Sequence, residues 1–302
     1  GSYNIGIGQS AGGAITTGQK NTLMGFGAGD ATTTADNNTA VGYDALTANT
    51  TGTRNVAVGA LALDANTTAS NNNAVGYSAM SANTTGAGNQ AFGDSALAAN
   101  TTAANNTAMG NFAMSANTTG FDNVAVGAIA LDANTTGNSN TAVGYGSLSA
   151  DTLGDRAVAI GKNALIAQNF TSTTDNYNTA VGYGTGAAVT TGVNNTLIGG
   201  LAGDATTTGT GNTAVGNESL GANTTGSDNV AIGKDALDAN TTADDNTAVG
   251  KSSLGSNTTG TQNVAVGRSA LLANTTANDN TGVGYNALTA NTTGTQNVAV
   301  GT

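Results

Sequence analysis

The stretch that decides the fold runs from Thr39 to Asn55 and reads TAVGYDALTANTTGTRN. Close copies of this unit follow one another along nearly all of the 302 residues, with a glycine at the fourth place of each. These glycines recur every seventeen residues, except for one step of twenty-one between Gly161 and Gly182. A fixed period of this length is typical of repeat proteins in which each unit forms one coil of a stack.

We number the unit from position 1 at Thr39 to position 17 at Asn55. Positions 1–3 and roughly 7–10 predict two short strands, because each run is followed by turn-forming residues. A glycine in every unit, with β-branched residues before it, argues against helix. Units stacked in register would form hydrogen bonds at a spacing of ~4.8 Å per coil. The sequence therefore predicts an all-β protein, a β-solenoid (parallel β-roll) of stacked seventeen-residue coils.

Exchanges of side-chain volume between positions predict which residues face the interior. Position 8 is Leu or Met in most units and Gly in four. In two of those four units the normally small position 2 becomes large, at Leu23 and Leu197. In the other two the usual Asn of position 11 becomes apolar, at Ile15 and Val189. Because a close-packed interior conserves volume, we expect positions 2, 8 and 11 to face it together.

Position 3 must point away from position 2, because neighbouring residues of a strand alternate between its faces. It is nevertheless apolar in every unit. A strand that is apolar on both faces is expected to be covered on both, and a bare apolar row would be an aggregation surface. We therefore predict an assembly face that includes Val41, Val58, Val75, Val126, Val143, Ile160, Val181 and Ile198.

Composition limits the kinds of protein this can be. The chain has 45 Gly, no Pro, Cys, Trp or His, and only 8% charged residues. Glu218 is the only Glu, and no catalytic constellation stands outside the repeat, so we expect no enzyme activity and no cofactor. A net charge of −11 disfavours nucleic acid and anionic membranes as partners. No apolar stretch approaches the ~18 residues that predict membrane insertion.

The strand-and-glycine element resembles a motif of a known family. Residues 158–161 and 230–233 (both VAIG) and residues 264–267 (VAVG) are similar to the Val-Ala-Ile-Gly motif of YadA-like head repeats. Those repeats occur in trimeric autotransporter adhesins and in some phage tail fibres. The resemblance implies a left-handed parallel β-roll, three chains packed side by side, and a role in surface attachment. The unit here is longer than is typical of the family, by an Asn-Thr-Thr-Gly turn.

Departures from the consensus recur and define larger blocks. The variant unit that begins at Thr22 reappears at Thr196, after ten units and a four-residue insertion near residues 169–175. This predicts two solenoid blocks, residues 1–178 and 179–302, in one continuous rod. Neither end carries the polar cap that solenoids need, so we expect a segment of a longer fibre or a subunit that stacks end to end. The insertion is expected to project as a loop carrying Phe170 and Tyr177.

The Asn-Thr-Thr of positions 11–13 is the sharpest polar feature. We favour an internal amide ladder that closes each turn. Glycan attachment fits the acceptor pattern, and rows of threonine such as Thr50 and Thr51 would suit ice binding. The expected ladder consists of Asn49, Asn66, Asn83, Asn100, Asn117, Asn134, Asn223, Asn240, Asn257, Asn274 and Asn291.

Acidic and amide residues at positions 15–17 offer oxygen ligands for Ca²⁺, as in residues 36–38, 122–123 and 244–246. They lack the Gly-Gly-x-Gly-x-Asp pattern of calcium-binding β-rolls, and many units have no Asp there. We interpret them as turn residues and expect no metal.

These patterns together predict a non-enzymatic extracellular structural protein, the shaft or head of an adhesive fibre on a cell surface or a virion tail. The expected partners are further copies of the chain, as a homotrimer or an end-to-end polymer, and a cell-surface or glycan receptor. A phage tail-fibre shaft and an ice- or glycan-binding solenoid are the alternatives.

Overall fold

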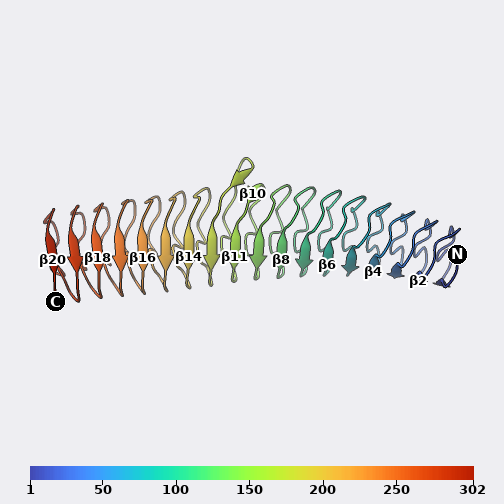
Figure 1. The fold of residues 1–302 in the computed structure, drawn as a ribbon, viewed down its shortest axis with the longest axis horizontal. Coiled ribbons are helices and arrows are strands. Elements are labelled where there is room, and N and C mark those ends of the chain that lie inside the picture. Colours follow the sequence, from blue (N-terminus) through green and yellow to red (C-terminus); the bar gives the residue numbers. More distant parts are fainter. The chain divides into compact units, whose positions relative to one another are not determined.

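The computed structural model of the protein describes residues 1–302 as two compact units, Gly1–Leu153 and Gly154–Thr302. Neither unit contains a helix. Each is a stack of coils in which one short strand per coil pairs in parallel with the strand of the next coil (Figure 1). Within each unit the predicted fold class, an all-β parallel β-solenoid, is confirmed. The predicted blocks 1–178 and 179–302 rest on sequence similarity and stay a prediction.

The first unit holds nine strands that pair in chain order with a constant offset of seventeen residues. Thr39, for example, lies opposite Val56, and Val41 opposite Val58. The strands are β1 (Ile5–Ile7), β2 (Thr22–Met24), β3 (Thr39–Val41), β4 (Val56–Val58), β5 (Asn73–Val75), β6 (Gln90–Phe92), β7 (Thr107–Met109), β8 (Val124–Val126) and β9 (Thr141–Val143).

The second unit repeats this arrangement and adds a separate two-stranded sheet. Its stacked strands are β11 (Val158–Ile160), β13 (Thr179–Val181), β14 (Thr196–Ile198), β15 (Thr213–Val215), β16 (Val230–Ile232), β17 (Thr247–Val249), β18 (Val264–Val266), β19 (Thr281–Val283) and β20 (Val298–Val300). The small sheet pairs β10 (Gly154–Asp155) with β12 (Thr174–Asp175).

Only positions 1–3 form a strand, so the predicted second strand at positions 7–10 is wrong. Positions 6 and 8 adopt left-handed backbone conformations, with φ of 49° at Asp44 and 55° at Leu46. Left-handed residues cannot continue an extended chain, so the segment turns instead. A left-handed conformation costs a non-glycine residue about 1–2 kcal/mol. Full burial of the Leu46 side chain offsets that cost, since burying a leucine is worth about 1.5–3 kcal/mol.

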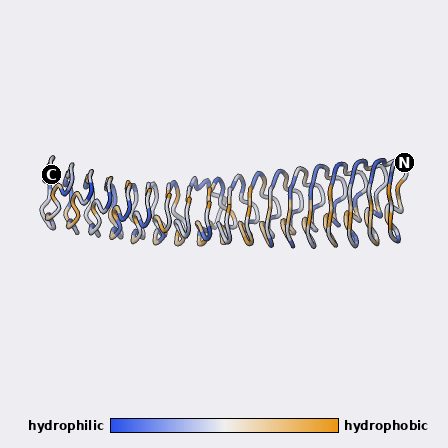
Figure 2. The backbone as a smooth tube through the Cα atoms, turned by 90° about the horizontal axis from the view of Figure 1, so that it is seen from below, coloured by the Kyte–Doolittle hydropathy of each residue, from blue (hydrophilic) through white to orange (hydrophobic).

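The core of each unit is a thin stack of small and medium apolar side chains. Position 2 and position 8 are completely buried, as at Ala40 and Leu46. Figure 2 shows hydrophobic segments recurring at the same place in successive coils of each unit. The predicted volume exchange is confirmed, because a Cβ at Gly29 would come within 2.8 Å of Leu23 Cδ2. The larger residue at position 2 therefore fills the space that position 8 leaves empty.

The insertion contributes β12, which pairs with β10 in a small sheet that stands out from the neighbouring coils of its unit (Figure 1). Tyr177 is 53% exposed, and its hydroxyl accepts a hydrogen bond from Arg156 Nη1 at 3.1 Å. Arg156 also forms an ion pair with Asp175. Phe170, however, is only 5% exposed, so the prediction that it projects is wrong. The loop folds over the ring because a phenyl group gains free energy on leaving water.

The glycine of position 4 has a backbone that other residues rarely adopt, with φ of 134° at Gly199. A Cβ there would overlap the carbonyl oxygen of Gly216 in the next coil. The neighbouring Gly200 is open, since the nearest atom to its Cβ would be Asn217 Nδ2 at 3.8 Å. The two adjacent glycines therefore form a matched pair.

We expect Gly199→Ala to lower the free energy of unfolding by about 1–3 kcal/mol or more, because it combines backbone strain with a steric clash. Gly200→Ala should change it by less than about 1 kcal/mol. Denaturant unfolding of both variants, followed by circular dichroism, measures the difference. Equal effects of the two substitutions would contradict the close approach of coils at position 4.

Candidate functional site

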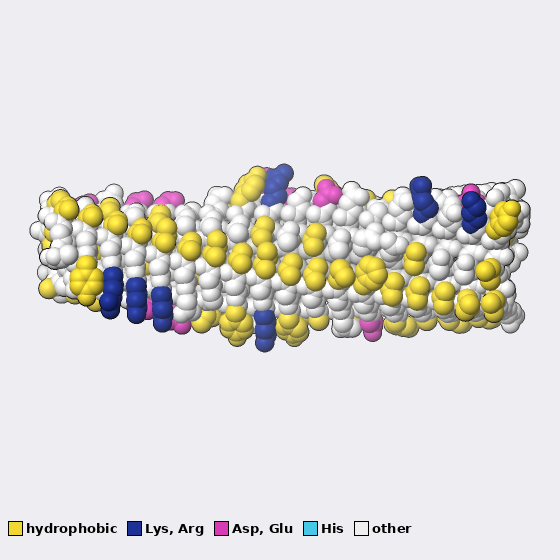
Figure 3. All heavy atoms as spheres, turned by 60° about the horizontal axis from the view of Figure 1, so that its bottom comes forward, with side chains coloured by type: hydrophobic (Ala, Val, Ile, Leu, Met, Phe, Trp, Pro, Cys, Tyr) yellow, Lys and Arg dark blue, Asp and Glu magenta, His cyan; other side chains and the backbone are white.

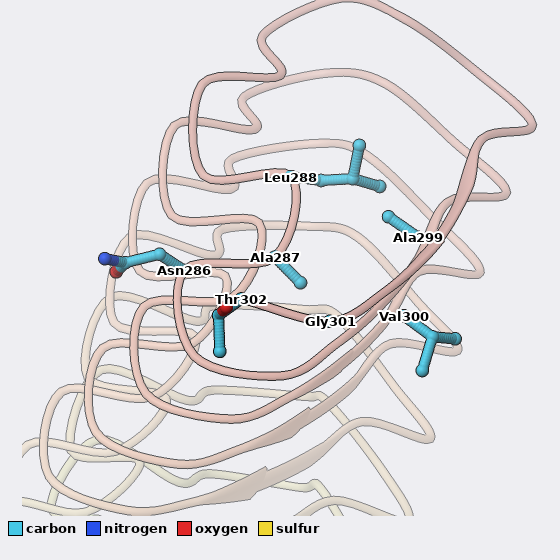
Figure 4. A pocket seen from close by; sticks show the side chains of 7 residues that line it. All are labelled: Asn286, Ala287, Leu288, Ala299, Val300, Gly301 and Thr302. Carbon is cyan, nitrogen blue, oxygen red and sulfur yellow. The ribbon is translucent and has the colours of Figure 1, made fainter.

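A small hollow lies at the end of the second unit. Its volume is about 160 Å³, and Figure 4 shows the side chains around it. The lining residues are Asn286, Ala287, Leu288, Ala299, Val300, Gly301 and Thr302. None of these side chains is an acid or a base, and Leu288 and Ala299 continue the apolar interior of the preceding coils. The rows of equivalent side chains that the stacking creates are therefore the candidate functional surfaces.

The Asn side chains of position 11 form one buried row in each unit. Asn66 Nδ2 donates to Asn49 Oδ1 at 3.0 Å and to the Ala69 carbonyl oxygen at 3.1 Å. The structure places the predicted ladder residues of the first unit, Asn49, Asn66, Asn83, Asn100, Asn117 and Asn134, at 0% exposure. Asn223, Asn240, Asn257 and Asn274 are equally buried in the second unit, and Asn291 is partly buried in its last complete coil.

A second buried Asn row, at position 17, was missed by the sequence analysis. Asn38 Oδ1 accepts a hydrogen bond from the Asn55 N–H at 2.9 Å, and Asn38 Nδ2 donates to the Gly52 carbonyl oxygen at 2.9 Å. The signal was present, because position 17 is Asn in almost every unit. A polar stretch at positions 15–17 predicts a turn but does not indicate that its last residue is buried. The amides of this row instead tie the backbone of one coil to the next.

Burial of the position-11 row contradicts the glycan-attachment interpretation for the folded coil. The Asn49 side chain is fully buried, and its Nδ2 donates to the Gly52 carbonyl oxygen at 3.0 Å. A sugar on this nitrogen would have no room. The two threonines that follow differ from each other: Thr50 Oγ1 donates to the Thr67 carbonyl oxygen at 3.1 Å, whereas Thr51 is exposed. Only the position-13 threonines therefore form an open row.

The acidic residues of positions 15–17 bond to the backbone of a neighbouring coil. Asp36 Oδ1 accepts from the Gln19 N–H at 2.6 Å, and Asp244 Oδ1 accepts from the Ser227 N–H at 2.7 Å. No group of three or more His, Cys, Asp or Glu side chains is arranged to hold a metal ion. The two hydrogen bonds are those of turn residues.

Carboxylates also stand at position 9. Burial raises the pKa of the Asp204 and Asp238 carboxyls, and nearby acidic groups, including Glu218, raise both further. Burial likewise raises the pKa of Asp132, although hydrogen bonds from its own N–H and that of Ala133 lower it in part. Asp204 and Asp238 stand two coils apart, on either side of Gly221, whereas Asp132 belongs to the first unit.

The predicted assembly residues all lie in strands with their side chains turned away from the interior. Val58, Ile160 and Ile198 are 36%, 38% and 39% exposed. The others, which are half-buried, are Val41, Val75, Val126, Val143 and Val181. Figure 3 shows hydrophobic side chains following one another along this face of each unit. Strand pairing brings neighbouring members into contact rows within a unit, such as Val126 beside Val143.

Comparison with models of known protein families finds no match, and comparison with curated protein sequences finds none. The chain forms no helix with the length and hydrophobicity needed to cross a membrane. What the protein does is therefore inferred from its surface rows.

The amide ladder can be tested at Asn117. Replacing it by Leu removes its donors to Asn100 Oδ1 and to the Gly120 carbonyl oxygen, and removes the acceptor for Asn134 Nδ2. We expect Asn117→Leu to lower the free energy of unfolding by about 1–3 kcal/mol or more, because buried polar atoms lose their partners. The control Asn111→Leu, at an exposed site of the same coil, should have little effect on a thermal melt. Similar melts for both variants would count against the ladder.

Proposed function

We propose that the chain is a non-enzymatic structural segment of an extracellular fibre, on a cell surface or a virion tail, whose copies associate side by side. One observation carries this proposal: position 3 is apolar in every coil, yet its side chains lie on the outside of each unit. Position 2, its neighbour in the strand, is completely buried. The apolar face at position 3 therefore serves contacts outside the coil. We call it the position-3 face.

The position-3 face suits a partner that runs along the stack. Each coil contributes one Val, Ile, Met or Phe, and each contributes only a small apolar area. A short overlap would therefore bind weakly, whereas many coils in register would bind tightly. This dependence on length is expected of a fibre shaft.

The partner that matches this face best is another copy of the chain. Its residues repeat at the strand spacing of ~4.8 Å, so a partner with the same period keeps every contact in step. Three copies side by side is the arrangement implied by the resemblance to YadA-like head repeats. The same packing suits a phage tail-fibre shaft, and a cell-surface or glycan receptor would then bind elsewhere on the exposed surface.

We expect the pair Val126→Asp and Val143→Asp to dissociate the assembly, because two charges would be buried at each contact. The native mass in solution, measured by light scattering, should fall from about three chains to one. Circular dichroism should show that the coils remain folded, since both side chains point away from the interior.

The matched control is the pair Thr119→Asp and Thr136→Asp, which adds the same charge at exposed sites outside the position-3 face. It should leave the mass unchanged. A wild-type protein that is monomeric over a wide concentration range, or a valine double variant of unchanged mass, would contradict side-by-side association.

One observation favours ice binding as a second candidate. The position-13 threonines are exposed in eight consecutive coils of the first unit and form a single regular row: Thr17, Thr34, Thr51, Thr68, Thr85, Thr102, Thr119 and Thr136. An ice-binding surface should produce thermal hysteresis in the wild-type protein. The pair Thr85→Lys and Thr102→Lys should abolish that hysteresis. A wild-type solution without hysteresis would eliminate this candidate.

A further inference from the structure

Position 5 of the second unit carries a feature that side-by-side association does not use. In three consecutive coils this position is a cation, at Lys234, Lys251 and Arg268. The whole chain has only seven Lys and Arg against eighteen Asp and Glu, so almost half of its cations stand in one row. Figure 3 shows basic side chains side by side near the C-terminal end of the second unit, next to hydrophobic ones. We call these three residues the cation row.

The backbone holds the cation row in register. The Ser252 N–H donates to the Lys234 carbonyl oxygen at 3.0 Å, and the Ser269 N–H donates to that of Lys251 at 3.0 Å. The strands just before these residues also pair in register, with β16 beside β17 and β17 beside β18. Successive cations are therefore offset by one strand spacing, ~4.8 Å. All three side chains are exposed.

Folding gains little from this arrangement. Like charges in adjacent coils repel one another. Lys234 Nζ lies 3.9 Å from Asp235 Oδ2, but neither Lys251 nor Arg268 forms an ion pair. The Arg268 guanidinium lies over the Tyr285 ring, 5.8 Å from its centroid. Three aligned cations in a chain of net charge −11 thus form a local positive site whose natural complement is an external polyanion.

We infer that the cation row binds a linear anionic polysaccharide, of the polyuronate or sulfated class, lying along the stack. One sugar ring of an extended polysaccharide advances by nearly the same length as one strand spacing. The carboxylate or sulfate groups that face the protein therefore recur at whole multiples of the strand spacing and stay in register with the cations. This inference rests on the proposed function, since it supplies the glycan partner of the adhesive fibre.

The residues at the two ends of the cation row fit the same ligand. Tyr285, in the coil after Arg268, is 50% exposed and continues the row with an aromatic ring, over which the Arg268 guanidinium lies. Asn217, in the coil before Lys234, is exposed; its Nδ2 donates to the Gly200 carbonyl oxygen at 3.0 Å, and its Oδ1 is an acceptor for a sugar hydroxyl. The adjacent position 6 is neutral at Ser252 and Ser269, so hydroxyl groups flank the two unpaired cations.

Nucleic acid fits the row less well. The phosphates of each duplex strand repeat at about 3.4 Å along the axis, out of step with the cations. Acidic neighbours at position 6, Glu218 and Asp235, limit the positive site to the side of Lys251 and Arg268. A nucleic acid therefore serves as the competing ligand in the test.

The experiment compares two charge-matched variants of the full chain. One is Lys251→Gln with Arg268→Gln, within the cation row. The other is Lys20→Gln with Arg54→Gln, two exposed cations of the first unit that lie two coils apart. Gln occurs naturally at position 5 and at position 16 of other units, so all four substitutions should fold. The probes are a size-defined polygalacturonate oligomer, its methyl ester as an uncharged equivalent, and a DNA duplex of similar length.

We expect calorimetric binding of polygalacturonate to weaken about tenfold or more in the cation-row variant, because two charge contacts are lost. The control variant should bind within about twofold of wild type, and the methyl ester should not bind. The native mass of both variants should equal that of the wild type, which separates this test from the test of side-by-side association.

Four binding results would overturn the inference: no binding of polygalacturonate by the wild type, equal weakening in both variants, equal binding of the methyl ester, or tighter binding of the duplex through the same cations. A changed native mass in the cation-row variant with unchanged saccharide binding would assign the row to an assembly contact instead, and would also overturn it.

Discussion

The hydrogen bonds between one coil and the next are the interaction on which everything else in each unit depends. They bond each residue to a neighbour of the equivalent residue in the adjacent coil, in the strands and in the turns alike, as where the Val56 N–H donates to the Asn72 carbonyl oxygen and the Leu46 N–H donates to the Ala62 carbonyl oxygen. Because the pairing keeps equivalent positions opposite each other, even across the longer step between β11 and β13, a residue at one position always lies beside residues of the same position. Side chains of the same position therefore form rows along each unit, and each row has the charge or hydrophobicity of its residues. The sequence can vary only where such a row tolerates variation.

The interior shows what that constraint demands. A coil of seventeen residues encloses only a few side chains, so it cannot build a thick apolar core. Two rows of buried Asn therefore stabilise the interior, because their amides form hydrogen bonds with the backbone and with one another. Leucines in left-handed turns supply the remaining apolar contacts. The cost of the turn conformation is offset by burial only when a coil lies above and below, so each coil depends on its neighbours.

On the exterior, the stacking also aligns equivalent side chains in rows, but these rows face solvent. In the two proposals, the outward-facing apolar row is a long contact face and the row of cations is a site for a repeating anion. Neither feature needs a pocket, since affinity accumulates along the stack as many weak contacts act together. The proposed fibre and the proposed polysaccharide site are two uses of this one property, on different positions of the coil.

The sequence by itself determined the period, the parallel in-register stacking, and which positions share the interior. The regular recurrence of the unit indicates the period and the stacking. The exchange of side-chain volume between positions 2 and 8 indicates that they share the interior, because a close-packed core conserves volume. Only the tertiary structure decided how the chain travels between strands. It placed left-handed turns where a second strand was expected, buried the Asn of position 17, and covered Phe170. The physical reason is that backbone conformation and burial at these sites depend on hydrogen-bond partners in the adjacent coil. A residue type alone does not reveal those partners.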